Sequence, residues 1–383
     1  MEATISGQTT MIEQLRRQLA SLMRVEEYTL VKPPDAVIAF RGQVYGDTET
    51  AFEHMTQRFA TYGYTAWLRD RPGGGHEVVA TKGVVERKPG RTWINVVLFL
   101  ATLLCVLFIG AGWAPQDAGM LEGPHNVLTY LLRGIPFAAT LLGILLTHEL
   151  SHYFVARRYG SPVSLPYFIP MPNILGTMGA VIMQRAPMRN RKALFDIGVA
   201  GPLGGLIVAI PLLILGLALS SVGPPPPGVD TALQEGNSLL YLGLKYLVFG
   251  KILPSNGEDV WLHPVAFAAW AGLLVTMINL IPVGQLDGGH ISYALLGRRA
   301  KTLGYVLIGA MVAWGGWLLR TGNQAGGFWM TWGFLNLLLN LRHPPPLDDA
   351  TRLDWRRVAL GLLVLVIFIL TFMPAPLQEI HLQ

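Results

Sequence analysis

The sequence is poor in cysteine and in charged residues. Cys105 is the single cysteine among 383 residues, which excludes an internal disulfide framework and any zinc site built from several cysteines. Charged residues make up only 14% of the chain, against about 25% in soluble globular proteins, whereas hydrophobic residues reach 51%. These values exclude a disordered protein and an ordinary soluble enzyme. They indicate a chain that spends much of its length in lipid, where a metal would be held by histidine and carboxylate side chains.

Apolar runs fill the chain after Trp93. A helix needs about 20 apolar residues to cross the roughly 30 Å of bilayer hydrocarbon. We therefore predict a polytopic α-helical membrane protein of about six to seven spans, with the lipid bilayer as its surroundings. The predicted spans are residues 94–114, 131–156, 194–220, 264–281, 302–320, 325–341 and 358–373.

The charges between these spans predict the orientation of the chain. One set of alternate connecting segments holds 16 Lys and Arg residues, whereas the other set holds three. The basic set comprises residues 84–93, 157–192, 297–301 and 342–357. By the positive-inside rule this set is cytoplasmic, and the N-terminal region with it. We expect an integral protein of a bacterial inner membrane. Basic residues spread over short loops beside spans argue against nucleic acid as a partner.

Residues 1–28 are predicted as an amphipathic N-terminal helix, because five apolar residues share one helical face. They are Ile12, Leu15, Leu19, Leu22 and Met23. This face indicates a packing or coiled-coil arm, with binding to a membrane surface as the alternative. No basic segment followed by an apolar run occurs here, so we expect no cleaved secretory signal.

Residues 29–86 are predicted as a small soluble α+β domain with a regulatory or accessory role. Its expected elements are a strand over 36–45, a helix over 47–62 that begins at Asp47 or Thr48, and two strands over 65–69 and 77–81. The domain holds no cluster of catalytic residue types, and the sequence does not identify its ligand or partner.

The second predicted span ends in an H-E-x-x-H motif, in which His148 and His152 enclose Glu149. Residues four apart share one helical face, so both imidazoles can reach one tetrahedral zinc ion. Glu149 lies too far round the helix to bind the same ion easily. It is instead placed to take a proton from a water that zinc has made more acidic. Ionisable residues at this depth are costly and usually functional.

A third ligand is required, and the best candidate is Asp287 near the end of the fourth predicted span. It is the only acidic residue between Val260 and Leu347. Pro282 ends the preceding helix, and the glycines after Asp287 permit a tight turn. The charge-based orientation makes the second and fourth spans run in the same direction, so both motifs lie on the same side of the membrane.

With these motifs, the chain resembles the site-2 protease family of intramembrane zinc metalloproteases. The resemblance covers roughly residues 130–300 and rests on H-E-L-S-H within a span and N-x-x-P-x-x-x-L-D-G-G about 130 residues later. Three further segments carry it: residues 164–170 (SLPYFIP), 176–180 (GTMGA) and 200–205 (AGPLGG). The stretch around 160–205 is most similar to the bacterial and plastid branch. The chain departs from many relatives at Gly284, where they have a second proline.

The resemblance implies a membrane-embedded metalloprotease domain over 93–375, with one zinc ion per chain. It implies His148, His152 and Asp287 as zinc ligands and Glu149 as the general base. It also implies a single-span membrane protein as substrate, cut in or near its transmembrane segment in regulated intramembrane proteolysis. Asn279 either steadies the substrate or its oxyanion, or forms a hydrogen bond between helices.

Residues 162–185 are too rich in proline and glycine to span the membrane as a helix, yet they are apolar. The resemblance implies a re-entrant, membrane-associated β-hairpin, with Gly176 and Gly179, that presents an unwound substrate by strand addition. A plain cytoplasmic loop is the alternative. The glycines of residues 201–205 indicate close packing between helices.

Two other functions remain open on the sequence alone. A transporter or ion-path protein would also contain buried His and Asp residues. It would not need Glu149, and we find no inverted repeat. A catalytically inactive family member is the second alternative, against which stands the presence of all four chemical residues.

Overall fold

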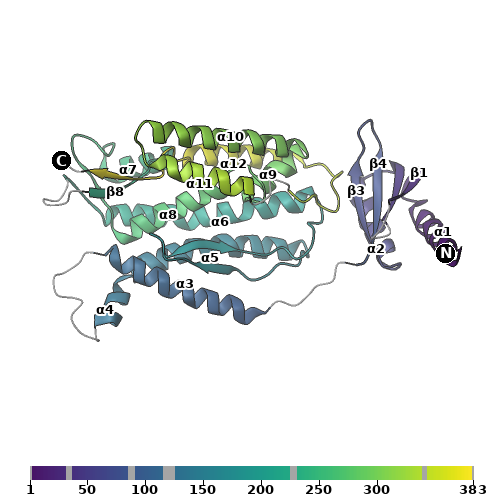
Figure 1. The fold of residues 1–383 in the computed structure, drawn as a ribbon, viewed down its shortest axis with the longest axis horizontal. Coiled ribbons are helices and arrows are strands. Elements are labelled where there is room, and N and C mark those ends of the chain that lie inside the picture. The colour runs from purple at the N-terminus through teal and green to yellow at the C-terminus, as the bar shows by residue number, and fades with distance from the viewer. Residues whose placement is uncertain are drawn as a thin grey trace.

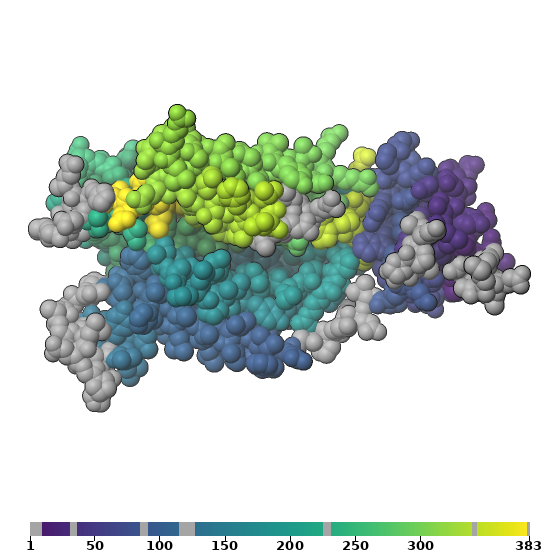
Figure 2. Space-filling model, viewed as in Figure 1, coloured from purple at the N-terminus to yellow at the C-terminus, as the bar shows by residue number. Residues whose placement is uncertain are grey.

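We describe the chain from a computed structural model, which covers residues 2–31, 37–84, 91–114, 126–224, 231–338 and 343–381. Most of its helices lie side by side along one long axis, and a small mixed module forms one end of the elongated molecule (Figure 1). We call this part, residues 2–82, the N-terminal module. The chain ends at the opposite end of the bundle, beside α7, and Figure 2 shows the same division as filled surface.

The N-terminal module is a four-stranded antiparallel sheet with two helices. The strands follow the order β1-β2-β4-β3 across the sheet. In chain order the elements are α1 (Glu2–Leu19), β1 (Met23–Val31), β2 (Val37–Val44), α2 (Thr48–Ala60), β3 (Tyr64–Asp70) and β4 (His76–Lys82). The predicted helix and the three predicted strands of residues 36–81 are confirmed, and Asp47 is the N-cap of α2.

The prediction of one helix over residues 1–28 is wrong in its last third. The helix ends at Leu19, and Met23 already pairs with Val44 in the first ladder of the sheet. Residues 25–31 are rich in β-branched and aromatic types, which favour a strand once a partner is available. Leu15 and Leu19 are fully buried in the module's core, so α1 acts as a packing arm.

All seven predicted spans contain a helix. These are α3 (Thr92–Gly112), α5 (Ile135–Arg158), α6 (Arg191–Ala218), α8 (Pro264–Asn279), α10 (Arg299–Arg320), α11 (Ala325–Leu338) and α12 (Trp355–Thr371). Among the described residues, three helices are long and apolar enough to cross a membrane: α3, α6 and α10. A fourth span results if α5 is counted together with α4 (Asn126–Arg133), to which it is bent by 51°.

The predicted count of six to seven spans is therefore not confirmed. The helices α8, α11 and α12 have 16, 14 and 17 residues, fewer than the roughly 20 that a straight span needs. The prediction counted apolar runs, and these continue into the turns. In α8, for example, Leu280 and Ile281 extend the apolar run, but the helix ends at Asn279 ahead of Pro282.

The outer faces of the long helices are apolar. Leu104 and Phe108 of α3 and Ile207 of α6 are more than half exposed. In each of α3 and α10, only 28% of an apolar 18-residue stretch is buried inside the protein. Large exposed apolar faces on a soluble protein would promote aggregation, whereas lipid covers them at no cost. The bundle is therefore built for a membrane.

A short helix and two small sheets close the end of the bundle away from the N-terminal module. Helix α7 (Leu239–Phe249) was not predicted. The sheets pair β7 (Ser221–Gly223) with β9 (Asp259–Trp261), and β8 (Thr231–Glu235) with β10 (Leu377–His381). Both are antiparallel.

A short segment of chain joins the N-terminal module to the bundle. We call residues 347–349 the docking strand. On one side the N–H of Leu68 in β3 donates to the carbonyl of Leu347, and the N–H of Asp349 donates to Leu68, both at 2.8 Å. On the other side Leu347 and Asp348 donate to the carbonyls of Met188 and Arg189, at 2.8 and 2.9 Å.

Charged side chains reinforce this contact. Lys192 lies 2.6 Å from Glu49, and Arg189 pairs with Glu53, so two carboxylates of α2 meet two basic residues at the start of α6. The hydroxyls of Thr48 and Thr351 are hydrogen-bonded at 3.2 Å. The module is thus held by backbone pairing at its sheet edge and by ion pairs at its helix.

We expect Asp47→Ala to destabilise α2 by about 1 kcal/mol, because the Asp47 carboxylate accepts a hydrogen bond from the N–H of Thr50 at 2.9 Å. The measurement is amide hydrogen exchange of the α2 amides in the full chain. Asp47→Ser, which keeps an N-cap acceptor, should destabilise α2 much less.

The same contact gives a pH dependence. The hydrogen bond from Thr50 lowers the pKa of Asp47 below its usual value, so its stabilisation is complete above the unfolded pKa of about 4. It is lost as the pH falls through the folded pKa. An exchange difference between wild type and Asp47→Ala that persists undiminished in strong acid would contradict this origin.

Candidate metal centre

Helix α5 carries the first part of the site. Its apolar residues, among them Leu141, Leu142 and Leu145, are buried in the main core of the bundle. His148, Glu149 and His152 continue the same buried surface, with 4%, 6% and 5% of each residue exposed. Three ionisable groups at such burial need partners, because an isolated buried charge is very costly.

The second part comes from the turn between α8 and α9 (Asp287–Leu296). Gly284 has a φ of +56°, which favours glycine, and reverses the chain after Pro282. A Cβ on Gly288 would lie 2.1 Å from the carbonyl oxygen of Leu280, so only glycine lets α9 fold back so closely. This turn places Asp287 at the first position of α9, facing α5.

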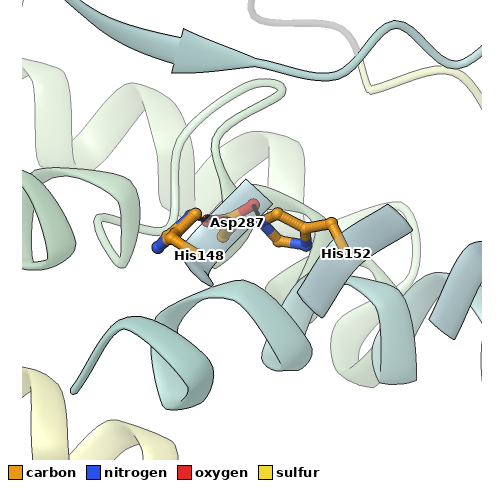
Figure 3. A group of neighbouring side chains, drawn as sticks. All are labelled: His148, His152 and Asp287. Carbon is orange, nitrogen blue, oxygen red and sulfur yellow. Dashed lines mark hydrogen bonds and ion pairs between the residues drawn. The ribbon is translucent and has the colours of Figure 1, made fainter. Parts of the chain in front are cut away.

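The structure brings the three predicted ligands together (Figure 3). The Asp287 carboxylate contacts both imidazoles, with Oδ2 at 3.1 Å from Nε2 of His148 and Oδ1 at 3.2 Å from Nε2 of His152. The two Nε2 atoms are themselves 3.1 Å apart. All three ligand atoms lie within 4.8 Å of one another.

This donor set fits a zinc ion. Zinc–nitrogen and zinc–oxygen distances of about 2.0–2.1 Å in a tetrahedron require ligand atoms about 3.3 Å apart, close to what is observed. The Nδ1–H of His152 donates to the carbonyl of Ile197 at 2.6 Å, which leaves the Nε2 lone pair of the neutral ring facing Asp287. Lone pairs that converge in this way need a cation.

Helix α6 makes room for these rings through its glycines. A Cβ on Gly201 would lie 2.0 Å from Nε2 of His152, and one on Gly205 would lie 3.3 Å from Nδ1 of His148. A Cβ on Gly204 would lie 2.0 Å from Oγ of Ser151. The predicted close packing between helices is therefore confirmed. Helix α6 packs against the face of α5 that carries His148 and His152.

A cavity of about 170 Å³ opens beside the three ligands. Glu149, the predicted base, and Asn279, for which the sequence left a substrate contact or a helix–helix hydrogen bond open, both line it. His290 also lines it, but it is not one of the three clustered ligands, and its Nδ1 lies 2.5 Å from Nε2 of His343. The space beside the candidate ligands is large enough for water.

One wall of the cavity is a β-hairpin, as expected for residues 162–185. β5 (Tyr167–Pro170) pairs with β6 (Thr177–Val181), and β5 packs against α3. The amide of Asn95 donates to the carbonyls of Leu165 and Pro166 at one end of α3, and the indole of Trp113 donates to Ile174 at the other. The hairpin therefore runs along the length of α3.

The two predicted hairpin glycines differ in role. Gly176 has a φ of +77°, and a Cβ there would lie 2.8 Å from the Cα of Val106, so it lets the turn touch α3. Gly179 has a φ of +100° but open space around it, so it serves the conformation of β6 itself. The residues after β6 reach the site, where the backbone of Ile182 interacts with the Glu149 carboxylate.

Several lining residues were not predicted. Gln184 and Met188 come from the chain between hairpin and α6, and Gln285 precedes Asp287 in the turn. Gln285 lies inside the N-x-x-P-x-x-x-L-D-G-G motif, so the sequence could have indicated that it lies near the site. Gln184 and Met188 stand in no motif, and only the folded hairpin brings them to the ligands.

Comparison with known proteins identifies the family to which this part of the chain is related. Residues 136–315, which include all three candidate ligands, match peptidase family M50. The chain carries a domain of this family. It is also 30% identical over 361 residues to a protein of Arabidopsis thaliana named probable zinc metalloprotease EGY2, chloroplastic. It is 30% identical over 381 residues to the Arabidopsis protein named probable zinc metalloprotease EGY1, chloroplastic.

These alignments cover most of this chain but less of the relatives. They include 91% and 88% of the chain, and 62% and 66% of the two Arabidopsis proteins. A protein of Oryza sativa named probable zinc metalloprotease EGY3, chloroplastic, is 28% identical over 64% of the chain and 43% of its own length. The chain thus spans less than two thirds of the length of each of these relatives.

We expect Gly201→Ala to lower the zinc affinity at least tenfold, because the new methyl group displaces the His152 ring from Asp287. The measurement is zinc per chain in the purified protein. Gly309→Ala in α10 is the matched control, since a Cβ there meets open space. Equal zinc content in both variants would show that α6 does not set the position of the ligand.

Proposed function

We propose that this M50 protein is a zinc-dependent intramembrane protease that hydrolyses a peptide bond in or near the transmembrane segment of a single-span membrane protein. The observation that carries this proposal is the meeting of His148, His152 and Asp287, from two separate helices, in a buried cavity that also contains Glu149. The similarity to proteins named zinc metalloproteases supports it.

Each residue has a distinct task in this proposal. His148, His152 and Asp287 hold one zinc ion, which supplies Lewis acidity and makes a bound water more acidic. Glu149 accepts the proton of the attacking water and later delivers a proton to the leaving nitrogen. Asn279, at the last turn of α8, lies on the cavity wall and offers an amide donor to the peptide oxygen.

The hairpin supplies a way to present the substrate. An α-helical segment hides its carbonyls in its own hydrogen bonds, so it must unwind before attack. In the described residues β6 pairs only with β5, and its other edge is free to accept an extended peptide. Because Val181 ends β6 and lines the cavity, such a peptide would enter beside Glu149.

The arrangement in the membrane follows from charge and helix length. We propose that α8, α11 and α12 complete the bundle together with the longer helices, which gives six to seven membrane segments. The module and the metal centre then lie on the side of the basic loops, the cytoplasm of a bacterial cell. Ion pairs from the basic residues Arg189 and Lys192 to the module support this common side.

The N-terminal module is proposed to be an accessory domain that acts through the docking strand. Leu347 of this strand is hydrogen-bonded to Met188, and Met188 lines the metal cavity. A movement of β3 is therefore transmitted over two backbone pairings to the cavity wall. We propose residues 2–82 as the range of this domain in place of the predicted 29–86, because α1 packs in the same core and β1 begins at Met23.

We expect Glu149→Gln to retain about one zinc ion per chain and to abolish cleavage of a single-span substrate. Asp287→Ala should lose both zinc and cleavage, since it removes a ligand. The measurements are metal content and appearance of product in reconstituted vesicles. Zinc retained by Asp287→Ala would contradict the ligand set, and cleavage retained by Glu149→Gln would contradict the proposed base.

Charge reversal tests the docking of the module. Glu49→Lys places like charges beside Lys192 and should increase hydrogen exchange at the amides of the docking strand. The double variant Glu49→Lys, Lys192→Glu should restore protection. Glu27→Lys, an exposed reversal on β1 far from the contact, is the control. Unchanged exchange in Glu49→Lys would mean that the backbone pairing alone holds the module.

A further inference from the structure

A second cavity lies behind the turn that carries Asp287. Its volume is about 280 Å³, which is at the lower edge of the range for small-molecule sites. Its floor is the turn itself, through Pro282, Gly284 and Gly289, and its rim carries basic side chains. We call it the basic pocket. Its lining residues are Pro282, Gly284, Gly289, Ser292, Tyr293, Arg298, Ala300, Lys301 and His343.

The charged side chains that line this pocket are both basic. Arg298 and Lys301 line it from the junction of α9 and α10, and neither forms an ion pair with any residue in the described part of the chain. The sequence contains no acidic residue between Val260 and Leu347 except Asp287, whose carboxylate is taken up by the two ligand histidines. The pocket is thus basic without internal compensation.

One carboxylate that contacts the pocket lining is paired with a basic side chain outside the pocket. Asp349 accepts a hydrogen bond from the hydroxyl of Tyr293 at 3.1 Å, and Arg191 pairs with it at 2.8 Å. The ring of Tyr293 is stacked on His343, 4.6 Å between centroids, and closes that side of the pocket. The ammonium of Lys301 makes only a distant contact with the ring of Tyr305, at 5.7 Å.

Two backbone N–H groups at this junction already donate hydrogen bonds within the chain. The N–H of Ala300 donates to Gly297, and the N–H of Lys301 donates to Arg298, so a ligand would be held by side chains. A guanidinium provides paired donors in a plane, and an ammonium provides a compact charge beside it. Together they match the several oxygens and the double charge of a phosphate group better than a single carboxylate.

We propose that the basic pocket binds a phosphate group, held by Arg298 and Lys301. The group belongs either to the headgroup of an anionic phospholipid or to a small soluble phosphate ester. Because the floor of the pocket is the turn that positions Asp287, a bound phosphate stabilises that turn. The link continues through His343, whose Nε2 lies 2.5 Å from Nδ1 of His290 on the wall of the metal cavity.

Two measurements on the full-length, zinc-loaded protein distinguish the sources. In the first, glycerol 3-phosphate is titrated into the protein in a neutral detergent and binding is followed by calorimetry. In the second, the protein is equilibrated with vesicles of phosphatidylcholine or of phosphatidylcholine with phosphatidylglycerol, and retained lipid is counted by native mass spectrometry. Saturable binding in the first identifies a soluble ester, and selective retention of phosphatidylglycerol alone identifies a headgroup.

Matched substitutions decide whether the basic pocket is responsible. We expect Arg298→Ser and Lys301→Ser each to weaken binding at least tenfold, and Lys301→Arg to retain it. Arg299→Ser removes the same charge from an exposed neighbour outside the pocket lining and should change little. Equal weakening by Arg299→Ser would reduce the effect to general surface charge and overturn the proposal, as would the absence of saturable binding in both measurements.

Discussion

The close approach of α6 to α5 is the contact on which the rest of the metal centre depends. Two imidazoles and the Glu149 carboxylate are buried, and Asp287 is partly buried, in a largely apolar bundle, where each group is costly unless it has a fixed partner. The absence of a side chain at Gly201 lets the His152 ring lie against α6, within reach of the carbonyl of Ile197. The turn at Gly288 brings the Asp287 carboxylate to the same ring, with Oδ1 at 3.2 Å from Nε2 of His152. The packing of α5 against α6 and the placement of the candidate ligands therefore depend on the same few glycines.

The meeting of the three candidate ligands could be predicted because their signals are local or follow from simple counts. Spacing along a helix puts His148 and His152 on one face, and the distribution of basic residues put Asp287 on the same side of the membrane. The structure brings those residues together. Four elements of the N-terminal module, β2, α2, β3 and β4, were predicted nearly to their boundaries for a similar reason, since the cap at Asp47 and the glycine turn before β4 are short-range signals.

Other features could not be predicted, because they depend on which distant strands pair or on where each helix ends within the membrane. The strand β1 carries apolar residues that also fit a helix, and only pairing with Val44 decides between the two. The docking strand has no periodicity, and its partners at Leu68 and Met188 are far away in the chain. The number of spans depends on where each helix ends, which an apolar run such as that at Ile281 does not mark.

The docking strand also sets an order of events during synthesis of the protein. The hydroxyls of Thr48 and Thr351, which meet across this contact, are separated by 303 positions in the chain. The ribosome therefore delivers the N-terminal module long before its docking site exists. Each newly made molecule passes through a stage in which β3 has been synthesised while residues 347–349, its partner in the finished fold, have not. An exposed sheet edge can pair wrongly, so chaperones have a defined interval in which to act on this protein.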